Sequence, residues 1–175
     1  INQLLANQCN DFEFTTSLAT GPEEAAIILS QDATTSIDGY LVYQMNCWNQ
    51  VVQTIAKSGK PVLYADFQFG GSGGFLVYNS GFLRDISSNI GVVASSNMED
   101  LVAAVKCFSL VKNGSSISDF VMATAKVRNE STPAAGNLSC KSDILNLRST
   151  ADCIVRLKES KILAVRDTES AILDS

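Results

Sequence analysis

The chain has 175 residues, a hydrophobic content of 46% and a charged content of 18%. A chain of this length and composition buries a globular core, which excludes disorder over most of the sequence. The net charge of -5, with Lys and Arg scattered, offers no basic patch for nucleic acid or anionic lipid, and no apolar run approaches the roughly 20 residues that span a bilayer.

Short apolar runs rich in β-branched and aromatic residues predict strands, and amphipathic segments between them predict helices. Strands are expected at 11–16, 40–43, 62–66 and 90–94, and helices at 1–9, 20–31, 48–57, 75–83 and 101–111. For residues 75–83 a strand is the alternative to the helix. A strand, a helix and a second strand in this order form a βαβ unit, which implies a buried parallel sheet.

The pattern weakens in the last third of the chain. Residues 118–127 favour a helix and leave a strand open, and residues 129–140, with a proline and a glycine, predict a mobile loop. One or two helices are expected within 143–160, then a last strand at 161–167 that merges into a polar tail over 166–175.

This alternation predicts one α/β domain over residues 1–175, a three-layer, doubly wound and mainly parallel sheet of the flavodoxin-like or Rossmann-like kind. In such a sheet the last strand, near Ile162, either replaces a missing first strand or lies at an edge. The sequence begins as if in the middle of an amphipathic helix, so we expect a fragment or a shortened chain.

Two features of the composition limit the chemistry. The sequence has no histidine, which removes a histidine-based triad, a histidine general base and histidine metal ligands from this chain. The five cysteines are widely spaced and odd in number, which favours reduced, mostly buried thiols in a cytoplasmic protein.

In an open parallel sheet, ligands bind beyond the carboxyl ends of the strands. The residues at these positions are Gln44, Asn46 and Trp48 after one strand, and Asp66, Gly70, Gly71, Ser72, Gly73 and Gly74 after the next. An indole beside amides suits a sugar, because the ring packs on a pyranose face while amides bond its hydroxyls. The alternatives are that Trp48 anchors the packing of its helix and that Asp66 caps the following loop.

The glycine run from Gly70 to Gly74 is either a tight loop at a site or interface, or a turn that binds an anion through its amides. It matches neither common nucleotide-binding motif, and Ser72 lacks the flanking pattern of a hydrolase nucleophile. Asp167 and Glu169 form a carboxylate pair that would need further ligands to hold Mg or Mn, so a solvated acidic tail is favoured.

Segments at 37–42, 48–57, 59–63 and 89–93 together resemble the N-terminal α/β region of the L-fucose and L-arabinose isomerase family. The likeness covers residues 1–112, and residues 161–165 are similar to the strand that leads into that family's next domain. The resemblance implies Mn-dependent aldose–ketose isomerisation by a whole oligomeric enzyme whose metal-ligating Glu, Asp and His lie in later domains. We carry over no catalytic residue to this chain.

The first hypothesis is therefore a sugar-isomerase-like α/β domain of a homo-oligomer, which contributes carbohydrate binding or subunit contacts and is not catalytic alone. The alternatives are a non-enzymatic module that binds a sugar or another small molecule, and an oligomerisation domain whose glycine loop contacts a neighbour. No metal ligand is expected in this chain, and the expected partners are a small-molecule sugar and further subunits.

Overall fold

A computed structural model of the chain describes residues 1–46, 48–66, 72–85, 88–132, 148–165 and 170–173. Contacts divide the chain into two units, Ile1–Ala135 and Gly136–Ser175, where the sequence analysis expected one domain. The parallel sheet and the helices packed on it belong to the first unit, so the α/β architecture is confined to that part of the chain.

The first unit is built on a three-stranded parallel sheet with the strand order β1-β2-β3. β1 spans Tyr40–Gln44, β2 spans Val62–Asp66 and β3 spans Ile90–Val93. Every residue of β2 and β3 is buried, as expected for parallel strands that are covered on both faces. The α/β class predicted from the sequence is confirmed at this level.

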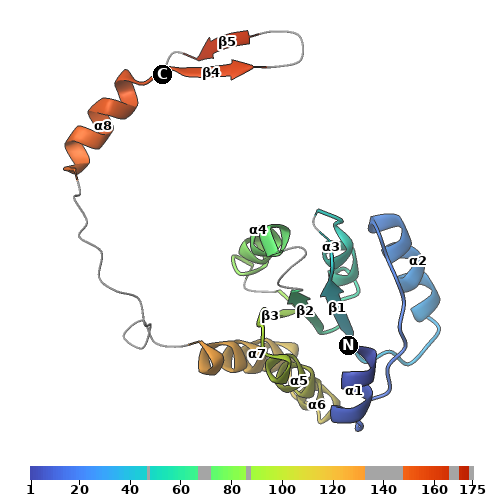
Figure 1. The fold of residues 1–175 in the computed structure, drawn as a ribbon. Helices are drawn as coiled ribbons and strands as arrows, with labels where there is room; N and C mark the ends of the chain where they lie inside the picture. Colours follow the sequence, from blue (N-terminus) through green and yellow to red (C-terminus); the bar gives the residue numbers. More distant parts are fainter. Residues whose placement is uncertain (47, 67–71, 86–87, 133–147, 166–169, 174–175) are drawn as a thin grey trace. The chain divides into compact units, whose positions relative to one another are not determined.

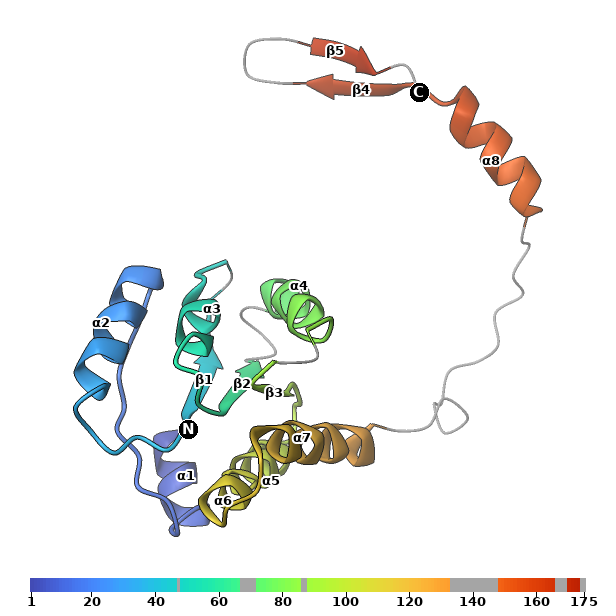
Figure 2. The ribbon, with the colours of Figure 1, turned by 180° about the vertical axis from the view of Figure 1, so that it is seen from behind.

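Among the described residues of the first unit, seven helices lie on the two faces of the sheet (Figures 1 and 2). They are α1 (Asn2–Gln8), α2 (Pro22–Asp32), α3 (Val51–Ala56), α4 (Ser72–Phe82), α5 (Met98–Lys106), α6 (Phe108–Lys112) and α7 (Ile117–Ser131). The views place α2, α3 and α4 on one face and α1, α5, α6 and α7 on the other.

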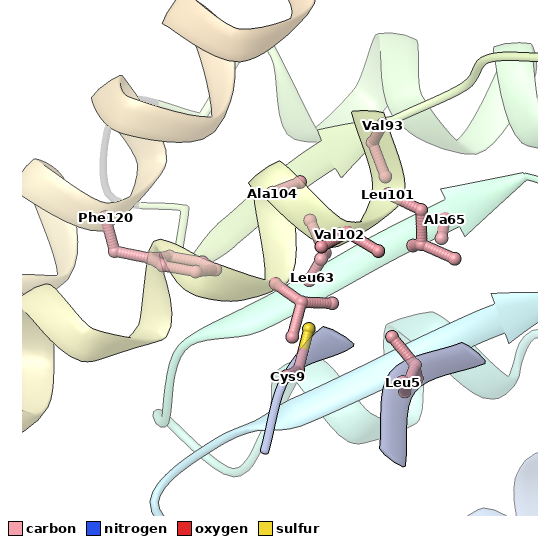
Figure 3. Packing of buried hydrophobic residues seen from close by; sticks show 10 residues of the cluster. Leu5, Cys9, Leu63, Ala65, Val93, Leu101, Val102, Ala104 and Phe120 are labelled. Atoms are coloured by element: carbon pink, nitrogen blue, oxygen red, sulfur yellow. The ribbon is translucent and has the colours of Figure 1, made fainter. Parts of the chain in front are cut away.

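Each face of the sheet has its own hydrophobic core, because successive side chains of a strand point to opposite faces. On the α5 face, Leu63 and Ala65 of β2 meet Leu101 and Val102 (Figure 3). Burying a leucine as completely as Leu63, which is 0% exposed, stabilises the fold by about 1.5–3 kcal/mol. On the face that α3 and α4 cover, the rings of Tyr64 and Phe75 pack with their centroids 4.5 Å apart.

Helix α7 lies unusually close to β3. A Cβ added at Gly91 would lie 2.6 Å from Thr124 Oγ1, which is closer than two such atoms approach in proteins. The helix is fixed at its start by a capping box, in which Ser116 Oγ accepts from Asp119 N while the Asp119 carboxylate accepts from Ser116 N. Gly91 leaves room for α7 to pack against β3, and the capping box fixes where α7 begins.

The second unit contains α8 (Thr150–Glu159), β4 (Ile162–Val165) and β5 (Ser170–Leu173). β4 and β5 pair antiparallel in a two-stranded sheet of their own. The expectation that the strand near Ile162 joins the parallel sheet or its edge is therefore wrong. Residues 170–173, expected in a polar tail, form β5 because Ala171, Ile172 and Leu173 supply a strand-forming run.

Three other segments differ from the secondary structure predicted for them. Residues 11–16 alternate like a strand but have no regular structure, since a strand requires a hydrogen-bonded partner. The helix expected over 101–111 is divided at Cys107 into α5 and α6. Residues 118–127 are helical, and α7 includes 129–131, which were expected in a mobile loop; residues 133–140 of that loop lie outside the described part of the chain.

A candidate ligand site at the carboxyl edge of the sheet

The three strands of the parallel sheet end at one edge. Gln44 and Asp66 are register partners at the ends of β1 and β2, and Ala65 pairs with Val93 at the end of β3. The chain after β3 continues through Ser95 into α5. Parallel pairing thus brings the ends of the three strands together, as ligand binding in sheets of this type requires.

Gln44 is built into the sheet interior. Its side chain is 3% exposed, and its Oε1 accepts a hydrogen bond from the hydroxyl of Tyr64 on the neighbouring strand. Asn46, two residues later, is exposed. Of these two amides, Asn46 is the one at the surface, and Gln44 holds the ends of β1 and β2 together.

Trp48 lies at the surface and not in the core. Its side chain is 61% exposed, and its ring meets Tyr78 of α4 edge-to-face with centroids 5.9 Å apart. The Gln50 amide donates to the Tyr78 hydroxyl at 3.3 Å, which ties the same loop to α4. This exposure does not fit the alternative in which the indole anchors the packing of α3.

The backbone around Trp48 is strained. Trp48 has φ 60° and Gln50 has φ 55°, so two residues with side chains adopt the left-handed region in one short loop. Each such residue costs about 1–3 kcal/mol and persists only where the surrounding structure holds it. Strain of this kind is concentrated at binding and catalytic sites, which makes the loop between β1 and α3 a candidate site.

Asp66 lines a small cavity at the same edge. The carboxylate belongs to a residue that is 7% exposed, and the cavity has a volume of about 10 Å³. The other lining residues include Tyr43, Val93, Ser95, Asn97 and Leu101, so the cavity is on the α5 side of the sheet. A cavity of this size holds about one water, whereas pockets for whole ligands measure about 300–1,000 Å³.

The charge of Asp66 acts on its neighbour in the cavity. Burial raises the pKa of the Tyr43 hydroxyl, and the negative charge of Asp66 raises it further. Asp66 Oδ1 is buried and has no hydrogen-bond partner among the described residues. A buried carboxylate oxygen without a partner is costly, so this oxygen lowers the stability of the edge as described.

The far wall of the cavity is a hydrogen-bonded network at the start of α5. Ser95 Oγ donates to Asp100 Oδ2 at 2.6 Å and accepts from the Asn97 amide at 3.1 Å. Asn97 caps α5, since its Oδ1 accepts from the Glu99 amide at 3.1 Å. Ser131 of α7 donates to the other oxygen of Asp100 at 2.8 Å and so joins α7 to this network.

The glycine run is only partly described. Gly70 and Gly71 lie outside the described residues, and Ser72, Gly73 and Gly74 form the first turn of α4. Gly73 is exposed, and a Cβ added there would meet no atom within 4 Å. The second half of the predicted loop is therefore a helix start, where the sequence analysis began the helix at Phe75.

Sequence reasoning missed two features. Tyr43 and Ser95 line the Asp66 cavity, and Ser95 could have been found by the same rule that selected Asp66, since it follows the next strand. The second feature is an open groove of about 370 Å³, lined among others by Lys57, Asn89 and Ser118. No pattern in the sequence indicates that groove, because its walls come from three distant segments.

Other kinds of functional feature can be assessed only among the described residues. Within the described ranges, no three acidic or cysteine side chains gather in a way that could hold a metal ion, and no helix is long and apolar enough to cross a membrane. Cys9, Cys107 and Cys153 are free thiols; Cys9 is buried, and Cys153 is exposed. The carboxylate pair at 167 and 169 lies outside the described residues.

Fold and site together define a mixed α/β protein with a small cavity and an exposed aromatic ring at the carboxyl edge of a small parallel sheet. No protein-family model matches the chain, and neither a curated protein nor a solved structure matches it. The geometry and chemistry of this edge are therefore the guide to what the protein does.

Proposed function

We propose that the first unit is a carbohydrate-binding α/β domain of the sugar-isomerase-like kind, which holds a small polyhydroxylated ligand at the carboxyl edge of its sheet and is not catalytic alone. The observation that carries the proposal is the ring of Trp48, which is 61% exposed at this edge and backed by Tyr78. A flat ring that is fixed in place and open to solvent is the surface on which the apolar face of a sugar stacks.

The loop around Trp48 supports this role in two ways. The edge-to-face contact with Tyr78 and the hydrogen bond from Gln50 restrict the ring before a ligand arrives, which lowers the entropic cost of binding. The exposed amide of Asn46 lies two residues away and provides both a donor and an acceptor for hydroxyl groups.

The proposal extends to the wider protein. Helices on both faces of a parallel sheet support a doubly wound, flavodoxin-like arrangement. In the isomerase reading, Mn and its ligands belong to further domains of a cytoplasmic homo-oligomer, and this domain contributes the sugar-binding surface.

A second candidate function is subunit contact. Leu76 and Val77 on α4 are 66% and 53% exposed, and Met45 after β1 is 61% exposed. Exposed apolar side chains such as these also suit an interface between copies of the chain. Ligand binding and assembly make different predictions, so one set of variants separates them.

The chain contains a single tryptophan, so its fluorescence reports on the proposed site directly. We expect a saturable change in emission when the full chain is titrated with aldoses such as L-fucose, L-arabinose or glucose. Trp48→Ala should abolish sugar binding in calorimetry while lowering the free energy of unfolding by no more than about 1.5 kcal/mol, because the exposed ring loses only its edge-to-face contact with Tyr78. Met45→Ala is the matched control, since Met45 has the same exposed fraction of 61%.

Sedimentation velocity tests the assembly alternative on the same protein. If α4 forms an interface, Leu76→Asp should dissociate the oligomer, and Ile27→Asp, at a 57% exposed position on α2, should not. A chain that responds to no sugar and dissociates on Leu76→Asp would contradict carbohydrate binding and support subunit contact.

A further inference from the structure

The loop around Trp48 depends on another element for its conformation. Trp48 and Gln50 both lie in the left-handed region, at φ 60° and φ 55°, which is unfavourable for residues with a side chain. Gln50 is also the N-cap of α3, and its side chain makes no capping hydrogen bond there. Backbone strain of this kind persists only where the surrounding structure holds it, so a contact from outside the loop is required.

Tyr78 of α4 supplies this contact with two parts of its side chain. Its hydroxyl accepts a hydrogen bond from the Gln50 amide at 3.3 Å. Its ring meets the Trp48 ring edge-to-face, with 87° between the ring planes and 5.9 Å between the centroids. Both left-handed residues of the loop are therefore in contact with one side chain of a different helix.

Helix α4 is itself fixed to the sheet, which makes Tyr78 a firm support. Phe75 is 3% exposed, and its ring packs against that of Tyr64 on β2 with centroids 4.5 Å apart. Phe82 meets the same tyrosine edge-to-face at 6.3 Å. Phe75, Tyr78 and Phe82 recur about one helical turn apart and pack against the same core cluster. The orientation of Trp48 is thus connected to β2 through α4.

We infer that Tyr78 is the positioning residue of the carbohydrate site proposed above, on which this step rests. Its hydroxyl holds the loop in the left-handed conformation through Gln50, and its ring limits the orientations that the indole can adopt. Tyr78 acts through Trp48 and requires no contact with the ligand. A ring that is ordered before binding loses less entropy when a sugar stacks on it, so Tyr78 contributes to affinity by preorganisation.

Tyr78→Phe removes the hydroxyl and keeps the ring. Without an acceptor for the Gln50 amide, we expect the loop to sample further conformations and the indole to move more freely. Trp48 is the single tryptophan of the chain, so time-resolved fluorescence anisotropy of the full chain measures this motion with no sugar present. The fast, local depolarisation of the indole should increase in Tyr78→Phe, and it should increase further in Tyr78→Ala, which also loses the ring contact.

Tyr40→Phe is the matched control. It removes a tyrosine hydroxyl that is hydrogen-bonded to Asp32, at the start of β1 and so at the opposite end of that strand from the loop. The depolarisation of Trp48 should be the same in Tyr40→Phe as in the unmodified chain. Far-UV circular dichroism verifies that each variant is folded, because a more mobile indole in a folded chain is not explained by a loss of stability.

Calorimetry on the same variants measures the consequence for binding. Tyr78→Phe should weaken the binding of the aldose that the unmodified chain binds most tightly, by about 2-fold to 10-fold, as for one side chain that must be immobilised on binding. Tyr40→Phe should bind this aldose as the unmodified chain does.

The combined results separate the positioning role from carbohydrate binding. Increased depolarisation together with weaker binding supports the positioning role. Unchanged depolarisation in Tyr78→Phe overturns it, and so does increased depolarisation with unchanged affinity. If the unmodified chain binds no aldose while Tyr78→Phe frees the indole, carbohydrate binding is overturned and the control of Trp48 by Tyr78 is supported.

Discussion

Replacing Gly91 with alanine tests the contact between β3 and α7. The added Cβ would lie 2.6 Å from Thr124 Oγ1, 2.8 Å from Thr124 Cγ2 and 3.0 Å from Phe120 Cε1. Thr124 is 1% exposed and Phe120 is 0% exposed, so neither side chain has room to turn away. Thr124 Oγ1 also donates to the Val121 carbonyl at 2.8 Å. The clash is therefore relieved only if α7 moves off the sheet.

Overpacking of this kind costs about 1–3 kcal/mol, and the lower backbone entropy of alanine in the unfolded chain returns about 0.4–1 kcal/mol. We expect a net loss of about 1–2 kcal/mol in the free energy of unfolding, measured on the full chain by urea denaturation with far-UV circular dichroism. Gly81→Ala is the matched control, because no atom lies within 4 Å of its added Cβ in α4. It should gain about 0.5–1 kcal/mol.

A double variant distinguishes the clash from a general effect of the substitution. Thr124→Ala removes the two closest atoms, so Gly91→Ala should cost less in that background than in the unmodified chain. Strictly additive effects, or a Gly91→Ala variant as stable as Gly81→Ala, would refute the close approach of α7 to β3.

Three further perturbations test other parts of the first unit. Leu63→Ala should lower the free energy of unfolding by about 2–5 kcal/mol, since the side chain is 0% exposed at the centre of the sheet; a loss below 1 kcal/mol would contradict that burial. Asn89→Ala should cost about 1–3 kcal/mol, because Asn89 Nδ2 donates to two backbone carbonyls at 3.0 and 2.5 Å; Ser88→Ala, which loses only the hydrogen bond that Ser88 Oγ accepts from Ile90 N at 3.3 Å, should cost less in the same unfolding assay. Hydrogen bonds from Ser116 lower the pKa of Asp119, so the capping stabilisation is present above the ordinary aspartate range and is lost as pH falls through the lowered pKa. Hydrogen exchange at the start of α7 should show this loss below about pH 4, and Asp119→Asn should remove the pH dependence.

The sequence predicted an element well where its pattern of apolar residues matches the faces that are buried in the fold. The strand at 62–66 was predicted with its observed bounds, because a proline precedes an uninterrupted apolar run that is buried on both faces. The strand predicted at 11–16 failed for the opposite reason. Its alternation requires one covered face, yet Phe14 is 39% exposed and only Phe12 packs partly against the core.

The sequence predicted which edge of the sheet carries the candidate site. It did not predict how each side chain is oriented there. Parallel topology alone places Gln44 and Asp66 side by side, and this was expected. That Gln44 would bond inward to Tyr64 depends on which face of the sheet that tyrosine occupies. That Trp48 would remain exposed depends on a left-handed backbone, which no sequence pattern indicated for a residue other than glycine.

The position of the Asp66 cavity follows from how the chain leaves the strands. The connection after β2 leads to α4 on one face of the sheet, and the connection after β3 leads to α5 on the other (Figures 1 and 2). Where neighbouring parallel strands are followed by helices on opposite faces of the sheet, a crevice forms at the carboxyl edge. Asp66 and Ser95 come from the ends of these two strands, and both line the cavity. The connection after β1 leads to α3 on the same face as α4, which is why Trp48 meets Tyr78 and lies apart from the crevice as a separate contact surface.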